Sequence, residues 1–197
     1  MPTGVAIRDV REQLFAAAER VLLRDGPSGL TSRAVTAEAG CAKGVLHRHF
    51  EDFDAFLAEL VLDRIDRIGR QAAELRARAG TGTVAGNLAA VLTDLLGSVV
   101  AKIVSLLIFR DDLRARLRQT TPSGVPLATE AAAMIASYLA SERDLGRIAA
   151  DADTDTLAPM LIGAAHLQFA GDQTGQPQPE AIRKMVASFL SGVLRDA

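Results

Sequence analysis

The chain has 197 residues, which is enough for one full domain and a small second one. Hydrophobic residues make up 49% of it, but aromatic residues only 4%, and tryptophan is absent. The core must therefore be built from Ala, Leu, Val and Ile, a composition that favours packed helices over sheets. The formal net charge of -2 excludes a uniformly basic nucleic-acid binder, so any contact with DNA must come from a local patch.

Cysteine content and the N-terminal residues bear on location. The single Cys41 excludes an intramolecular disulfide, and residues 1–9 lack the basic start and apolar stretch of an export signal. We therefore expect a cytoplasmic protein. Residues 88–109 are long enough to cross a bilayer, but Asp94 and Lys102 would each cost about 2.5 to 3.5 kcal/mol near its centre. We expect a buried helix there and no membrane partner.

Helix signals fill the sequence, and no stretch alternates apolar and polar residues as a strand would, so we expect an all-α fold. An amphipathic first helix ends near Gly26, and Thr31 or Ser32 then caps a short second helix. A short third helix carries Leu46 and Phe50 on its inward face. Two short helices joined by a glycine-containing turn are typical of a DNA-reading helix-turn-helix.

A long fourth helix is expected from Asp54 to the region of Gly80. The remaining helices are expected over residues 83–109, 111–118, 126–141, 154–170 and 179–194, which makes about nine in total. We expect a DNA-binding domain of three helices over residues 1–53 and a helical ligand-binding and dimerisation domain over residues 54–197.

Residues 80–85 match the relaxed dinucleotide-binding pattern G-x-G-x-x-A. That site needs a strand before the glycines, so that the pyrophosphate meets a helix start at a sheet edge. The residues before Gly80 have a helical pattern instead. We interpret the glycines as a turn between two helices.

Residues 8–57 resemble the DNA-binding domain of the tetracycline-repressor (TetR) family of bacterial regulators. The matching motifs are Leu14-Phe15-Ala16-Ala17-Ala18 with Gly26; Thr31, Val35, Ala39 and Gly40; and Lys43-Gly44-Val45-Leu46 followed by His49-Phe50. The chain departs from the family at Ala42, where a helix-capping Ser is usual. It departs again at His47 and Phe53, where the usual Tyr and Lys contact phosphate.

The resemblance implies a homodimer that binds a near-palindromic operator in double-stranded DNA, as a repressor released by a ligand. The residues expected to contact DNA are Thr31, Arg33, Lys43, Gly44, Val45, His47 and Arg48. Residues 1–53 contain seven basic and seven acidic residues, so their formal charges cancel. Binding to DNA must therefore depend on how these charges are distributed over the surface of the domain. The residues expected at the dimer interface, on the last two helices, are Leu157, Leu161, Ala164, Ala165, Met185, Phe189 and Val193.

An apolar pocket with few polar groups is expected in the helical body, for an unidentified hydrophobic effector. Its expected lining is Leu96, Val99, Ile103, Phe109, Met134, Tyr138 and His166. The three histidines show no metal-ligand spacing, and no nucleophile with a partner base is recognisable, so we expect no metal, no cofactor and no enzymatic activity. The alternative is a small-molecule-binding helical protein, or less favourably an enzyme, whose degenerate N-terminal domain no longer binds DNA.

Overall fold

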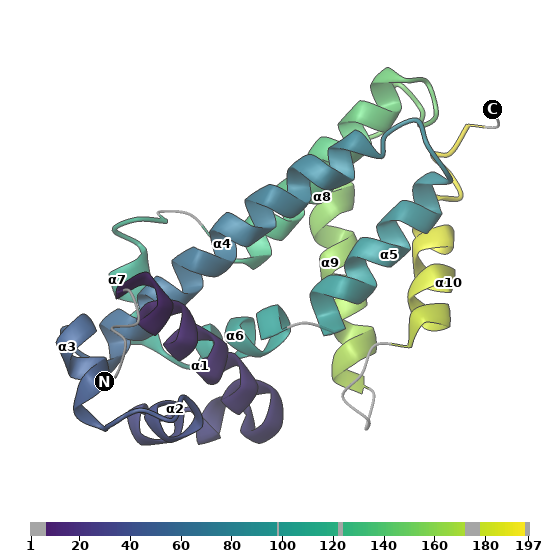
Figure 1. Ribbon diagram of the computed structural model, residues 1–197. Helices are drawn as coiled ribbons and strands as arrows, with labels where there is room; N and C mark the ends of the chain where they lie inside the picture. The colour runs from purple at the N-terminus through teal and green to yellow at the C-terminus, as the bar shows by residue number, and fades with distance from the viewer. Residues whose placement is uncertain (1–6, 98, 122–123, 172–177, 196–197) are drawn as a thin grey trace. The chain divides into compact units, whose positions relative to one another are not determined.

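The computed structural model describes residues 7–97, 99–121, 124–171 and 178–195. Within these ranges the regular structure consists of ten α-helices, with one isolated antiparallel bridge between Ile148 and Leu194 (Figure 1). The all-α prediction is therefore confirmed. The helices are α1 (Ile7–Gly29), α2 (Ser32–Glu38), α3 (Gly44–His49), α4 (Phe53–Ala77), α5 (Val84–Gly97), α6 (Val99–Ile108), α7 (Asp111–Leu117), α8 (Ala128–Asp144), α9 (Thr154–Gly171) and α10 (Pro179–Leu190).

The chain forms two compact units. The first comprises residues 1–63 and 102–122, and the second residues 64–101 and 123–197. The first unit thus holds α1 to α3, the start of α4, most of α6 and all of α7. The functional boundary between residues 53 and 54 stays a prediction, because packing alone does not say which residues bind DNA.

Four phenylalanines form the centre of the first unit. The ring centroid of Phe15, on α1, lies 6.0 Å from that of Phe50 and 5.6 Å from that of Phe56. Phe50 and Phe56 meet edge to face at 5.0 Å, and Phe53 stacks on Phe56 at 5.7 Å. Such aromatic contacts add to the free energy gained by burial. The cluster fixes α1, the end of α3 and the start of α4 to one another.

In the second unit, α9 packs against α8, α5 and α10, and α10 also packs against α5 (Figure 1). One side chain at its centre, Glu142, is charged and 0% exposed. Its carboxylate accepts hydrogen bonds from the Gly80 backbone N–H at 3.1 Å, from the Tyr138 hydroxyl at 2.5 Å and from the Arg147 guanidinium at 3.1 Å. Arg147 also donates to the Gly82 carbonyl at 2.6 Å. These contacts hold the turn between α4 and α5 against α8.

The glycines of the dinucleotide-like pattern lie in this turn. Gly80 and Gly82 have φ values of 78° and 57°, which favour glycine, and they follow α4, which ends at Ala77. The interpretation as a helix-helix turn is confirmed, and the Gly80 N–H is already bonded within the protein.

Two helix predictions need correction. The single helix expected over residues 83–109 is in fact two, because α5 ends at Gly97, a residue type with poor helix propensity. The described residues therefore form ten helices, where about nine were expected. The last helix ends at Leu190 and not at residue 194, because Val193 and Arg195 form backbone hydrogen bonds with the segment after α8. Among the described residues, no single helix has the length and apolar character to cross a membrane, although α5 and α6 pass that test jointly as a bent pair.

Candidate DNA-binding face and candidate cavity

Helix α3 is held by its inward side chains. Leu46 is fully buried and Phe50 nearly so, as their spacing predicted. The opposite side of α3 is left to solvent. Helix α2, which packs against α3, begins where predicted: the Thr31 hydroxyl accepts a hydrogen bond from the Ala34 backbone N–H at 3.1 Å. Thr31 is therefore the helix cap.

Most residues predicted to contact DNA lie on the surface of the first unit. Thr31, Arg33, Lys43, Gly44, His47 and Arg48 are exposed, and Val45 is half-buried. Contact with DNA stays a prediction for each. Lys43 stands at the N-cap of α3 and no side chain caps this helix, in keeping with Ala42 in place of the usual Ser.

Three basic residues of α1, Arg11, Arg20 and Arg24, are paired with carboxylates. Arg20 and Arg24 both bind the carboxylate of Glu38, each at 2.7 Å, and Arg11 pairs with Glu59. The hydrogen bonds from Arg24 and then Arg20 hold the pKa of Glu38 below its ordinary value. These three arginines add little positive potential to the surface.

The basic residues on and just before α2 and α3 differ from these three arginines. Across the described ranges of the chain, no hydrogen bond or ion pair holds the side chains of Arg33, Lys43 or Arg48, all of which are exposed. The equal numbers of acidic and basic residues in residues 1–53 therefore conceal an uneven division. Among the described residues of this stretch, the basic residues that have no carboxylate partner lie on or just before α2 and α3. Their positive charge would attract the phosphate backbone of DNA to this surface.

Arginines from later in the sequence neutralise the acidic residues that follow α3. Arg116, on α7, lies 2.7 Å from the carboxylate of Asp52 and 3.2 Å from that of Glu51. Arg110 lies 2.5 Å from Asp54. The hydrogen bond from Arg116 holds the pKa of Asp52 below its ordinary value. Acidic groups that would repel DNA beside α3 are thus offset within the same unit.

Sequence reasoning missed Arg110 and Arg116. They are 56 to 65 residues away from their partners, so no local pattern links them. The only available signal was the basic character of residues 110–118. Phe53 was identified as a departure from the family pattern, and its packing on Phe56 gives it a role in the core of the first unit.

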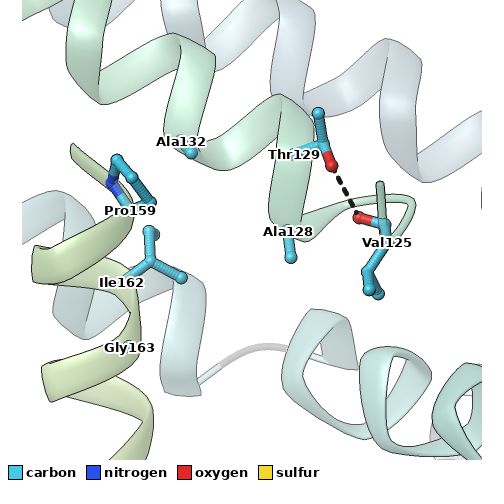
Figure 2. Close-up of a pocket in the computed structure, with 7 residues that line it drawn as sticks. All are labelled: Val125, Ala128, Thr129, Ala132, Pro159, Ile162 and Gly163. Carbon is cyan, nitrogen blue, oxygen red and sulfur yellow. Dashed lines mark hydrogen bonds between the residues drawn. The ribbon is translucent and has the colours of Figure 1, made fainter. Parts of the chain in front are cut away.

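A cavity of about 420 Å³ opens between α8 and α9 in the second unit (Figure 2). Its lining is almost wholly apolar and consists mainly of small side chains: Val125, Ala128, Thr129, Ala132, Pro159, Ile162 and Gly163. The one hydroxyl, on Thr129, donates to the Val125 carbonyl at 3.1 Å (Figure 2). The cavity therefore offers space and apolar contact, and few polar anchors.

None of the residues expected to bind a ligand lines this cavity. Leu96, Val99, Ile103 and Met134 are buried, Tyr138 is buried with its hydroxyl bonded to Glu142 and Asn87, and His166 is half-buried. Phe109 contradicts the expectation, because its side chain is 85% exposed just beyond the end of α6. Apolar spacing cannot show where a helix ends, so it placed Phe109 on the inside. A ligand at the other expected residues stays a prediction.

Three of the residues expected at the dimer interface pack inside their own chain. Leu161 and Ala165 are fully buried and Met185 is nearly so, so they cannot supply an exposed interface. Helix α10 packs against α5 and α9 of the same unit, and its buried residues Ile182, Met185 and Val186 form an apolar stripe. A stripe facing a core and a stripe facing a partner have the same spacing. The rest, Leu157, Ala164, Phe189 and Val193, are half-buried.

No three or more His, Cys, Asp or Glu side chains gather into a metal site among the residues that the structure describes. Cys41 is half-buried after α2, and burial raises the pKa of its thiol.

The fold resembles those of several solved bacterial transcriptional regulators. Over 98% of the chain it resembles a putative TetR-family transcriptional regulator from Mesorhizobium loti, with a TM-score of 0.71, 16% identity and all of that chain covered. It resembles the regulator FadR from Bacillus subtilis, solved with stearoyl-CoA, over 92% of this chain and 98% of that one, with a TM-score of 0.66 and 16% identity.

A putative transcriptional regulator from Saccharomonospora viridis, solved with choline, is also similar. The match covers 96% of this chain and 100% of the other, with a TM-score of 0.69 and 14% identity. At such identities these likenesses establish the fold alone. No curated protein matches the sequence significantly.

The sequence itself carries the family signal in its N-terminal part. Residues 14–60 match the model of the bacterial regulatory proteins of the tetR family. This segment contains most of α1, all of α2 and α3, and the first residues of α4, and it includes the exposed Arg33, Lys43 and Arg48. Residues 14–60 therefore form a DNA-binding domain of the kind found in the bacterial regulatory proteins of the tetR family.

Proposed function

We propose that this protein is a cytoplasmic, non-enzymatic repressor that binds an operator as a homodimer and is released by a small hydrophobic molecule. The observation that carries the proposal is the division of charge in the first unit. Arg33, Lys43 and Arg48 are exposed and have no partner among the described residues, whereas Arg11, Arg20 and Arg24 of α1 are paired with carboxylates. When unpaired cationic side chains bind phosphates, they displace counterions that are condensed on the DNA, and this release supplies binding affinity.

A dimer is needed because one short helix reads few bases. Helix α3 has six residues, and its outward face offers Lys43, His47 and Arg48. Two such helices, about 34 Å apart or a similar repeat, would enter successive major grooves of a near-palindromic site. An effector that favours another spacing would lower operator affinity, a coupling typically worth about 1 to 3 kcal/mol.

The test is binding to the DNA upstream of the protein's own coding region, by fluorescence anisotropy at several salt concentrations. Arg20→Ala is the matched control for Lys43→Ala and Arg48→Ala, because it removes a cation of the same unit that is already paired with Glu38. We expect the Lys43→Ala/Arg48→Ala double variant to bind at least about tenfold more weakly, with the salt slope reduced by about 1 per lost phosphate contact. Arg20→Ala should bind like the wild type. Undiminished binding by the double variant would refute the proposal.

A further inference from the structure

Helix α3 receives little support from its own sequence. It has six residues, the first of them is Gly44, and the side chain of its N-cap residue, Lys43, makes no capping hydrogen bond. A helix this short is not stable alone in water, because its few hydrogen bonds do not offset the cost of nucleation. Contacts with the rest of the first unit must therefore fix its position. The buried Leu46 supplies one of them, and others lie at its C-terminal end.

Arg11 of α1 binds that C-terminal end in two ways. Its guanidinium donates a hydrogen bond to the backbone carbonyl of His49, the last residue of α3, at 3.3 Å. The guanidinium carbon also lies 4.5 Å from the ring centroid of Phe50, the C-cap residue, in a cation–π contact. The last carbonyls of a helix lack partners within it and carry the negative end of its dipole, so a cation stabilises them. An ion pair with Glu59 joins the same guanidinium to α4.

Gln13, two residues further along α1, makes the equivalent contact with α2. Its side-chain amide donates a hydrogen bond to the backbone carbonyl of Ala39, the C-cap residue of α2, at 2.9 Å. Positions two apart are separated by about 200° around a helix, so Arg11 and Gln13 leave α1 in nearly opposite directions. One helix thus binds the C-terminal carbonyls of both helices of the helix-turn-helix.

The orientation of α3 decides which bases it can read. A helix of six residues is about 9 Å long, so a shift of about 2 Å at one end tilts its axis by about 13°. Side chains that recognise a ligand must be held within about 10–20° of their productive geometry. General attraction to phosphates depends on charge more than on this angle. A displaced α3 would therefore lose operator recognition and keep its non-specific affinity for DNA.

We propose that Arg11 and Gln13 are positioning residues for operator recognition. They set the orientation of α3 and α2 through the C-terminal carbonyls of these helices, and they do not themselves contact DNA. Both precede residues 14–60, so the match to the family model does not include them. The proposal rests on the DNA binding of the proposed function, and it adds the elements that hold the reading helix in place.

Two DNA probes separate positioning from charge: the DNA upstream of the protein's own coding region, and a duplex of equal length and scrambled sequence. Arg11→Met keeps an unbranched side chain and removes the guanidinium. Arg20→Met is the matched control, because Arg20 is another α1 arginine paired with a carboxylate, and among the described residues it makes no bond to α3. By fluorescence anisotropy, we expect Arg11→Met to bind the upstream DNA at least about fivefold more weakly than Arg20→Met. Affinities for the scrambled duplex and salt slopes should be equal.

Three further variants test the cause of this selective loss. Gln13→Met changes no charge and should also weaken binding to the upstream DNA alone. Arg11→Lys should recover part of the affinity, because an ammonium group can donate to the His49 carbonyl and lie over an aromatic ring. Adding Glu59→Gln to Arg11→Met removes the carboxylate that has lost its partner, and it should restore nothing if orientation is the cause.

Hydrogen exchange tests the same contact without DNA. The Phe50 N–H bonds to the Leu46 carbonyl at 3.0 Å and closes the last turn of α3. This amide should exchange at least about fivefold faster in Arg11→Met than in Arg20→Met, because the end of α3 opens more often. Arg11→Lys should recover part of the protection. Circular dichroism establishes that each variant folds.

Three results would overturn the proposal. Equal losses of affinity in Arg11→Met and Arg20→Met would leave charge as the only effect. A salt slope about 1 smaller in Arg11→Met than in Arg20→Met would make Arg11 a phosphate contact. Unchanged exchange at Phe50 would show that Arg11 does not hold α3. A wild-type chain that does not distinguish the two duplexes would refute the proposed function instead, and hydrogen exchange would still decide whether Arg11 fixes the reading helix.

Discussion

Arg116 binds Asp52 across 64 residues of sequence, with 2.7 Å between its guanidinium nitrogen and the carboxylate oxygen. The same oxygen of Asp52 accepts a hydrogen bond from the Ala55 backbone N–H at 2.6 Å, at the start of α4. One carboxylate thus caps α4 and is neutralised by α7. Since Asp52 follows shortly after α3, this contact affects both helix stability and the electrostatic potential beside the candidate DNA-binding face.

Replacing Arg116 should therefore weaken DNA binding even if Arg116 never touches DNA. In Arg116→Gln, the carboxylates of Glu51 and Asp52 lose their partner and repel phosphates. We expect roughly two- to fivefold weaker binding at low salt, with the difference shrinking as salt screens the charges. Adding Asp52→Asn should restore part of the affinity, because asparagine can still cap α4. Anisotropy titrations of the two variants measure this, and equal affinities for them would argue against the explanation.

Phe53 offers a second test, because the family usually has a lysine there. Phe53→Lys should lower the free energy of unfolding by about 0.5 to 1.5 kcal/mol, since the stack on Phe56 is lost. The new ammonium group should strengthen binding to DNA and steepen the salt slope by about 1. Urea unfolding and salt-dependent anisotropy measure the two effects. Phe53→Leu is the control, and it should change stability without changing the salt slope.

Glu142 should be among the most sensitive positions in the second unit. Glu142→Ala leaves the Arg147 guanidinium, the Tyr138 hydroxyl and the Gly80 N–H without their acceptor, so we expect a loss of about 3 kcal/mol or more. Tyr138→Phe removes two hydrogen bonds, the one donated to Glu142 and the one accepted from Asn87, and should cost about 1 to 2 kcal/mol. Burial, and then the bond to Glu142, raise the pKa of Tyr138, which therefore stays protonated and donates. Urea denaturation would contradict this account if the two variants were equally stable.

The ion pairs of Glu38 predict how stability changes in acid. Its pKa is lowered in the folded state, so its contribution is fully present above the pKa of the unfolded chain and is lost as pH falls through the folded pKa. The stability difference between wild type and Glu38→Gln should therefore be constant near neutral pH and shrink below the ordinary carboxyl pKa of 4.5. Thermal unfolding followed at a series of pH values measures the difference, and one that grew in acid would have the wrong sign.

Local patterns predicted local structure well. The spacing of Leu46 and Phe50 gave the inward face of α3, Thr31 gave the cap of α2, and the glycines at 80 and 82 marked a turn. Each of these depends on residues within a few positions of one another, where backbone geometry decides the outcome.

Contacts between distant segments could not be predicted in the same way. The pairing of Arg116 with Asp52 depends on which helices pack together. The interface assignment of Leu161 and Met185 failed because apolar spacing does not distinguish a chain's own core from a partner's surface. The cavity is formed by small residues of α8 and α9, and alanine and glycine give no periodic signal of a hollow.

Helix α4 contributes residues to both compact units, since the division falls after Asp63. This limits how the DNA-binding part could be isolated. A fragment cut after residue 53 would lack Phe56, a fully buried ring in contact with Phe15 and Phe50, and would leave an apolar surface open to water. Such a fragment should aggregate or unfold. A workable minimal DNA-reading peptide must carry the chain at least to residue 63, and supplying α7 in trans would restore its missing charge partners.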